Sequence, residues 1–113
     1  MKTIIFHNPR CGKSREALAL LKEQNQDVEI VEYLKDALTE KDIKKLLTIL
    51  NLKPVQLIRV KEDVFKEFKN KELTDKQYIE LLVKYPILIE RPIVIKGNKA
   101  VIGRPPQLLL DIL

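Results

Sequence analysis

The sequence predicts an α/β fold in which a small mixed sheet carries a block of helices inserted into the middle of the chain. Two observations indicate this class. Residues 2–34 contain an apolar β-branched segment, an amphipathic segment and a second β-branched segment, the order of a parallel strand–helix–strand unit. Near the end of the chain, two apolar segments flank a glycine-containing turn, which indicates an antiparallel hairpin.

The first of these regions is expected to form a parallel pair of strands. Residues 2–8 are predicted to be a buried strand, ended by the turn signal Asn8-Pro9. Residues 12–25 carry alanine and leucine at helical spacing, so they are expected to form a helix with one apolar face. Residues 28–34, rich in valine, isoleucine and tyrosine, are predicted to be the second strand.

The middle of the chain is predicted to be helical. Residues 39–42 resemble a capping box that opens a strongly amphipathic helix, which ends before Pro54. A short helix is expected over residues 63–68, and Thr74 is expected to cap another that Pro86 stops. No glycine- or serine-rich linker separates these helices from one another.

The last region returns to strands. Residues 92–95 and 100–102 are predicted to pair as a hairpin, with Gly97 in its turn. Two prolines then introduce a final helix over residues 107–113. The order β-α-β, helices, β-β-α is that of a thioredoxin-like domain with four strands and an inserted helical subdomain. The 113 residues are therefore expected to form a single domain, with the insertion at about residues 36–90.

Composition excludes several function classes. One cysteine cannot form an internal disulfide, and one cysteine with one histidine cannot supply a tetrahedral zinc site. No apolar run approaches the roughly 20 residues that span a bilayer, and the N-terminal apolar run is too short for a signal peptide. We therefore expect a cytoplasmic protein with no metal, no tightly bound cofactor and no membrane partner.

The net charge of +5 does not indicate nucleic-acid binding. Lysines and acidic residues are interleaved along the predicted helices, and aromatic residues make up only 5% of the chain. Mixed charge of this kind is typical of a solvated helix face, and stacking platforms for bases need aromatic residues. No nucleic-acid partner is expected.

Cys11 is the strongest candidate for a reactive residue. It lies between a predicted strand and a predicted helix, where unpaired N–H groups and the helix dipole lower the pKa of a thiol. Arg10, Lys13 and Arg15 add positive charge, and the hydroxyl of Ser14 is within reach to donate to the thiolate. The alternative is an inert structural cysteine, but the polar and cationic neighbours favour reactivity.

Three further residues have a functional and a structural interpretation. Ser14 stands where a Cys-x-x-Cys motif would have its second cysteine, so any disulfide must form with another molecule. His7 is either a hydrogen-bond or charge partner of the thiolate, or a histidine satisfied at a strand end. Pro92 begins a strand, which indicates either a cis peptide bond after Arg91 or an ordinary trans proline.

The arginines are distributed differently from the lysines. Arg10 and Arg15 flank the cysteine, Arg91 and Arg104 each precede a proline, and Arg59 lies alone in the helical block. A planar guanidinium binds oxyanions in a bidentate manner, so convergence on an anion is one interpretation. Scattered surface arginines in ordinary salt bridges are the alternative.

Residues 7–15, His7-Asn8-Pro9-Arg10-Cys11-Gly12-Lys13-Ser14-Arg15, resemble the active-site loop of the glutaredoxin-linked arsenate reductases, the ArsC family. Residues 86–94 and 103–113 resemble two further signatures of that family, and Arg59 falls where the family keeps another arginine. The resemblance covers essentially the whole chain. Within the loop, Asn8 and Gly12 are expected to have structural roles beside the site.

The resemblance implies a thioredoxin-like fold and an arsenate reductase activity. The family's nucleophile maps onto Cys11, whose thiolate attacks arsenate, and its histidine maps onto His7, which helps keep the cysteine ionised. The oxyanion-binding arginines map onto Arg59, Arg91 and Arg104. The resemblance also implies a cis proline at Pro92, with glutathione as co-substrate and glutaredoxin as the partner that completes turnover to arsenite.

Lys13 departs from the family pattern, because many relatives have threonine there; it either strengthens the anion site or is solvated. Two other functions are compatible with the residues. A monothiol glutaredoxin-like oxidoreductase would need Cys11 but tolerate loss of the arginines. A regulator resembling the Spx-type proteins would bind RNA polymerase without catalysis, although Ser14 replaces the second cysteine that such regulators often carry. A monomer is expected in each case.

Overall fold

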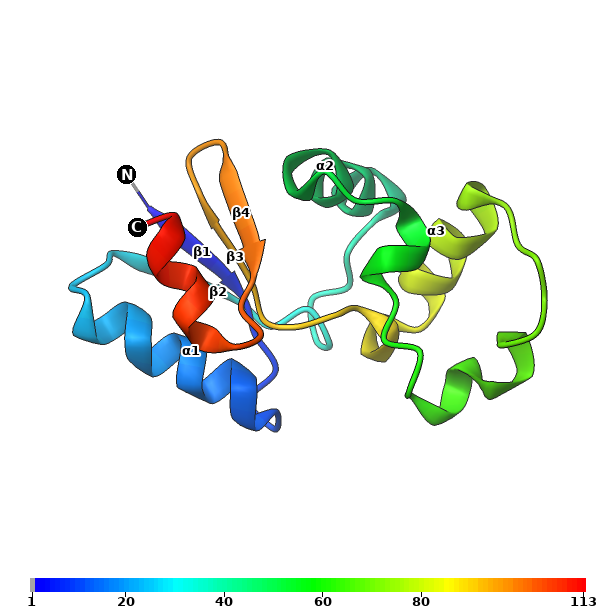
Figure 1. Ribbon diagram of the computed structural model, residues 1–113, viewed down its shortest axis with the longest axis horizontal. Coiled ribbons are helices and arrows are strands. Elements are labelled where there is room, and N and C mark those ends of the chain that lie inside the picture. Colours follow the sequence, from blue (N-terminus) through cyan, green and yellow to red (C-terminus); the bar gives the residue numbers. More distant parts are fainter. Residues whose placement is uncertain (1) are drawn as a thin grey trace. The chain divides into compact units, whose positions relative to one another are not determined.

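The computed structural model describes residues 2–113, which form two compact units (Figure 1). The first unit contains the chain up to Asp36 together with Arg91–Leu113, and the second contains Ala37–Glu90. The first unit is a mixed sheet covered by helices, and the second is helical. The predicted α/β class with a mixed four-stranded sheet is confirmed.

The sheet of the first unit has the strand order β2-β1-β3-β4. Its strands are β1 (Thr3–Phe6), β2 (Val28–Val31), β3 (Ile93–Lys96) and β4 (Lys99–Ile102). β1 lies at the centre, parallel to β2 and antiparallel to β3, and β4 completes the hairpin. The hairpin turn places Gly97 at a positive φ of 63°, a conformation that favours glycine.

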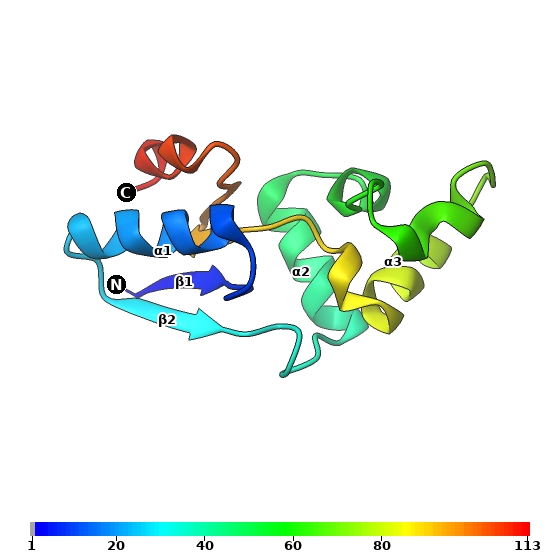
Figure 2. The same cartoon turned by 90° about the horizontal axis from the view of Figure 1, so that it is seen from below.

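Helix α1 (Gly12–Glu23) and the 3₁₀ helix η4 (Pro106–Asp111) lie on one face of this sheet (Figure 2). The core between them and the sheet consists of fully buried apolar residues from the sheet, α1 and η4: Ile5, Ala17, Leu21, Val94 and Leu109. A Cβ added at Gly103 would lie 3.0 Å from Cδ2 of Leu109. Glycine at this position therefore lets η4 pack closely against the end of β4.

The second strand and the final helix differ most clearly from the sequence predictions for the first unit, and the other elements differ only in the residues at their ends. The second strand ends at Val31 rather than at Leu34, because the chain turns there: the N–H of Lys35 donates to the carbonyl of Glu32. The final helix is 3₁₀, which fits its short length and the proline at its first position.

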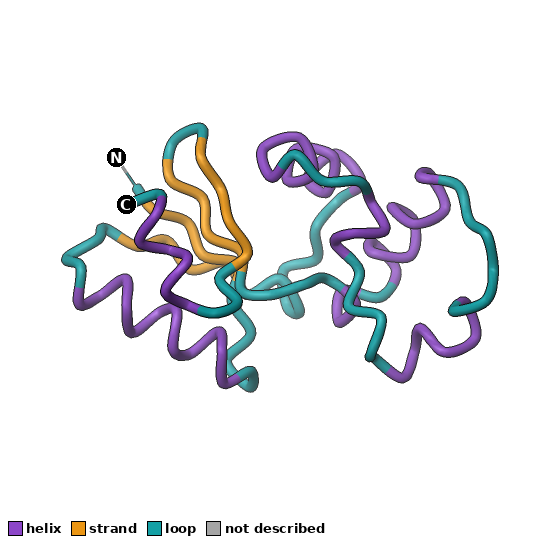
Figure 3. Tube along the Cα trace, in the orientation of Figure 1, coloured by secondary structure: helices purple, strands orange, loops and turns teal. Residues whose placement is uncertain are grey.

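The second unit consists of two α-helices and three 3₁₀ helices (Figure 3). They are α2 (Glu40–Leu50), η1 (Pro54–Leu57), η2 (Asp63–Phe68), α3 (Asp75–Lys84) and η3 (Pro86–Leu88). The predicted capping box at residues 39–42 is present, since the Thr39 and Asp42 side chains each accept a hydrogen bond from the other's backbone N–H. Throughout residues 2–113, every helix is too short or too polar to cross a membrane.

Candidate active site

The loop between β1 and α1 places Cys11 at the amino end of the helix. Cys11 is the N-cap of α1, and its carbonyl accepts the first helical hydrogen bond, from the N–H of Arg15 at 3.0 Å. The N–H of Cys11 donates to the carbonyl of Asn8. The free thiol is half-buried, so it is both held by the fold and accessible to a small reactant.

The pKa of the Cys11 thiol lies below its usual value. Burial opposes ionisation, but the backbone N–H of Ser14 and the side chain of Arg91 both act as donors that favour the thiolate and lower the pKa. The positive charge of Arg91 and the backbone N–H of Lys13 favour the thiolate further. The helix terminus and one guanidinium therefore activate this cysteine together.

Ser14 acts on the thiol through its backbone. Its fully buried hydroxyl oxygen lies 2.6 Å from Nδ1 of His7 and accepts a hydrogen bond from the N–H of Asn8 at 3.0 Å. From the sequence, this hydroxyl was expected to donate to the thiolate. In the structure its hydrogen bonds go to His7 and Asn8, and the group that lowers the pKa of Cys11 is the Ser14 N–H.

His7 is buried, with 6% of its surface exposed. Burial lowers its pKa; the charges of Arg15 and Lys22 add to this effect, and Glu32 opposes it. The imidazole is therefore neutral at pH 7. Of the two roles left open by the sequence, a positively charged partner for the thiolate does not fit this histidine, whereas a hydrogen-bonding role through Ser14 does.

Asn8 closes the loop with three hydrogen bonds. Besides donating to Ser14, it accepts from the N–H of Cys11 through its carbonyl and from the N–H of Arg10 through Oδ1 at 3.0 Å. By contrast, a Cβ added at Gly12 would meet only Nη2 of Arg15, at 3.8 Å. Local packing therefore fixes Asn8 but does not require glycine at position 12.

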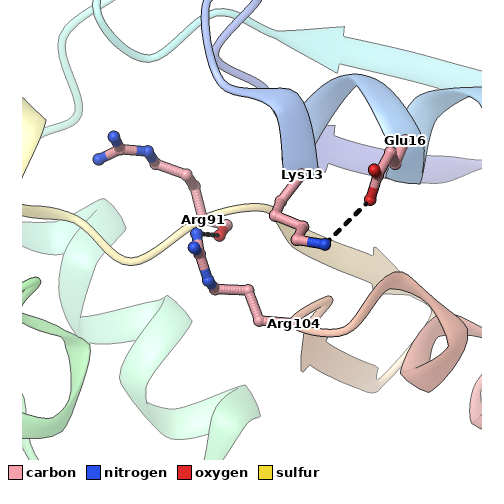
Figure 4. Close-up of polar contacts among 4 residues, drawn as sticks. All are labelled: Lys13, Glu16, Arg91 and Arg104. Atoms are coloured by element: carbon pink, nitrogen blue, oxygen red, sulfur yellow. Dashed lines mark hydrogen bonds and ion pairs between the residues drawn. The ribbon is translucent and has the colours of Figure 1, made fainter.

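Arg91 and Arg104 lie together in the first unit (Figure 4). Nη1 of Arg104 donates to the carbonyl of Arg91 at 3.3 Å, and the side chain of Arg91 in turn lowers the pKa of the Cys11 thiol. The Arg91–Pro92 peptide bond is cis, and so is the Arg104–Pro105 bond, which the sequence analysis did not anticipate. The structure thus brings the cysteine and two of the three selected arginines into one site.

Arg59 belongs to the second unit. Its Nε lies 3.2 Å from Oε1 of Glu62, and its backbone N–H donates to the carbonyl of Leu88. Its Nη1 atom is buried and has no hydrogen-bond partner within residues 2–113. The sequence analysis did not select Glu62, although the i, i+3 spacing from Arg59 was a usable signal for the ion pair.

Lys13 also has a partner that sequence reasoning missed. Its ammonium forms an ion pair with Glu16 at 3.4 Å (Figure 4), and both side chains are exposed. No group of histidine, cysteine and carboxylate side chains within residues 2–113 is arranged to hold a metal ion. The site therefore consists of a thiol, backbone N–H groups and cationic side chains, a combination suited to nucleophilic attack on an anion.

Comparisons with known proteins agree with this arrangement. A family model described as the ArsC family matches residues 6–112. The chain is 39% identical to an arsenate reductase of Haemophilus influenzae, over the full length of both proteins. It is 45% identical to the uncharacterized protein YfgD of Escherichia coli, over 96% of this chain and 93% of YfgD. The solved structure of an arsenate reductase from Vibrio cholerae superposes with a TM-score of 0.94 at 39% identity, covering 100% of this chain and 98% of that one.

Proposed function

The chain belongs to the ArsC family, and from this premise we propose that it is an arsenate reductase, an oxidoreductase that converts arsenate to arsenite with external thiols. The observation that carries the proposal is the effect of Arg91 on Cys11, because this guanidinium favours the thiolate and lowers the pKa of the thiol. It places a cation beside a thiol of lowered pKa, where a nucleophile and an oxyanion have to meet.

Charge neutralisation is the first requirement of the reaction. A thiolate and an arsenate anion repel one another, so fixed positive charge has to offset both before the sulfur approaches arsenic. Arg91 and Arg104 supply it from the first unit, and we assign the same task to Arg59. Guanidinium groups suit this task because they remain protonated and offer paired donors to oxyanions.

The chemistry needs two electrons, which two external thiols supply. In the proposed sequence, the Cys11 sulfur bonds to arsenic and displaces one oxygen as water, and glutathione displaces a second oxygen in the same way. A glutaredoxin thiol then attacks the glutathione sulfur. The S–As bond to glutathione breaks, its electron pair stays on arsenic, and a mixed disulfide leaves. Water releases arsenite from Cys11, so arsenate and two thiols give arsenite, one disulfide and one water.

The single cysteine explains the need for outside thiols. Cys11 has no second cysteine in the chain with which to form a disulfide, so the oxidised product must reside on other molecules. The same free thiol suits a reducing compartment, and we propose that the protein works in the cytoplasm as a monomer.

The test is an assay of arsenite formation with purified protein, glutathione and glutaredoxin. Activity is expected for the wild type, with losses of at least about tenfold in kcat/KM for Arg91→Ala and Arg104→Ala, because each removes an interaction with a charged group. Arg10→Ala is the matched control. Absence of arsenite formation with every thiol donor tested would refute the proposal.

A second assay separates the alternative enzyme. A monothiol oxidoreductase would reduce glutathione mixed disulfides and depend on Cys11 alone. The mixed-disulfide assay is run with the wild type and the arginine variants, with and without arsenate. If the variants reduced the disulfides as fast as the wild type, and added arsenate did not change the rate, that function would replace the proposed one.

A further inference from the structure

We propose that Lys13 is an additional cation of the anion site, and that Glu16 holds its ammonium in an ion pair that an arriving oxyanion replaces. Lys13 would then set how strongly the site binds its anion, with Glu16 as an internal competitor. The identity of the anion, arsenate, rests on the proposed function. The geometry and the test below do not.

The position of Lys13 supports this role. It is the second residue of α1 and follows the N-cap residue Cys11 by two positions, so its side chain starts from the helical turn that begins at the nucleophile. Figure 4 shows this side chain on the side of α1 where Arg91 and Arg104 are drawn.

The room around the Lys13 ammonium supports it as well. Lys13 and Glu16 line a hollow of about 470 Å³ between α1 and η4, together with Pro105 and Pro106. Pro105 directly follows Arg104. The space open to the lysine therefore adjoins the segment that carries the second arginine of the site.

The ion pair with Glu16 is of a kind that breaks easily. The N–O distance is 3.4 Å, and the two side chains are 48% and 57% exposed. Ion pairs this exposed contribute little to stability, and a lysine stem has many accessible rotamers. Arg91, in contrast, is only 6% exposed and is held by the fold.

Lys13 is also the cation of the first helical turn that is available to move. The first turn of α1 contains no acidic residue. Arg15, a further cation near the loop, donates from Nη1 to the carbonyl of Pro9 at 3.0 Å and so braces the loop itself. Glu16 is the ion-pair partner of Lys13, so an oxyanion at the sulfur competes with this carboxylate for the ammonium.

The test measures the electrostatic environment of Cys11 without any turnover. Iodoacetate and iodoacetamide alkylate the same thiolate, but only iodoacetate is negatively charged. The ratio of their rate constants at one pH cancels the degree of thiol ionisation and reports the positive potential that an anion meets at the sulfur. The measurement is made at low ionic strength, where screening is weak.

Three variants give distinct expectations. Lys13→Gln should lower the iodoacetate-to-iodoacetamide ratio about two- to fivefold, and Glu16→Gln should raise it by a similar factor, the range expected for an exposed pair. The double variant should match Lys13→Gln, because Glu16 acts only through the lysine. Protection of Cys11 against iodoacetamide by arsenate and by phosphate should change in the same order.

A second ion pair supplies the matched control. Glu40 and Lys44 on α2 form an exposed pair with the same N–O distance of 3.4 Å. Glu40→Gln and Lys44→Gln change the net charge equally and should leave the ratio unchanged. If Glu16→Gln left the ratio at the wild-type value, or the double variant showed the simple sum of the single effects, the proposal would be overturned. A wild type that failed to reduce arsenate would refute the proposed function and leave this result intact.

Discussion

Nδ1 of His7 lies 2.6 Å from the hydroxyl oxygen of Ser14, and the backbone N–H of this serine favours the Cys11 thiolate. The single histidine therefore acts on the nucleophile indirectly, through its contact with Ser14 in the first turn of α1. Because the imidazole is neutral at pH 7, it orients the serine rather than supplying positive charge. To orient the serine, the His7 ring has to hold its proton on one particular nitrogen. The hydrogen bond with the buried Ser14 hydroxyl helps to fix that tautomer.

Ser14→Ala should destabilise the fold more than it alters the thiol. The substitution leaves the buried N–H of Asn8 and a ring nitrogen of His7 without their partner, at a cost of about 1–3 kcal/mol in the free energy of unfolding. The backbone N–H at position 14 remains, so the pKa of Cys11 should stay below its usual value. Urea denaturation and the pH dependence of alkylation measure the two effects. A large rise in that pKa with unchanged stability would contradict this division of roles.

Arg91→Met should raise the pKa of Cys11. The guanidinium favours the thiolate through a hydrogen bond and through its charge, and methionine keeps much of the volume of a nearly buried side chain. The midpoint of the pH profile of iodoacetamide alkylation should therefore move to higher pH, and the rate below that midpoint should fall. Arg10→Met is the control, because it removes the same charge from the residue directly before Cys11. Its alkylation profile should stay close to that of the wild type. Equal profiles for both variants would remove Arg91 from the activation of the thiol.

Stability should fall as the pH drops through the titration of His7. Burial lowers the pKa of this histidine in the folded protein, so the unfolded chain takes up a proton first, near pH 6.5. The free energy of unfolding should therefore decrease from about pH 7 downward, with a slope of at most about 1.4 kcal/mol per pH unit from this group. Urea denaturation of the wild type and His7→Gln between pH 5 and 8 is the measurement. A slope as steep in the variant as in the wild type would assign the effect to other groups.

Two glycine substitutions should behave differently. Gly103→Ala would place a Cβ 3.0 Å from Leu109 and 3.3 Å from Cγ of Pro92, so η4 or the proline segment has to shift, at a cost of about 1–3 kcal/mol. Gly12→Ala meets open space, with only Arg15 at 3.8 Å, and alanine is a better helix former than glycine. Thermal denaturation should show a lowered Tm for the first variant and an equal or higher Tm for the second. The reverse order would contradict the packing described for η4.

Local patterns predicted the parts of the fold that depend on neighbours in sequence. The Thr39 and Thr74 capping boxes and the position of Cys11 at the start of α1 follow from residues three or four apart. The same patterns could not tell α from 3₁₀ helix at residues 106–111, where the helix is short and opens with proline.

Contacts made by tertiary structure were less accessible from sequence. Arg91 acts on the pKa of Cys11 because β3 pairs with β1 and brings a distant segment to the nucleophile loop. The direction of the Ser14 hydroxyl depends on how the loop folds over His7. The family resemblance and the residue chemistry identified Arg91 and Ser14 as candidates. They did not predict which group each side chain interacts with.

The central claim is that the Cys11 thiolate carries arsenate reduction, and the most direct measurement is the initial rate of arsenite formation by the wild type and by Cys11→Ser with glutathione and glutaredoxin present. Serine keeps the size and the N-cap position of the residue but is a far weaker nucleophile at neutral pH. We predict arsenite formation by the wild type and none above the thiol-only background for the variant. Equal rates for the two proteins would contradict the account.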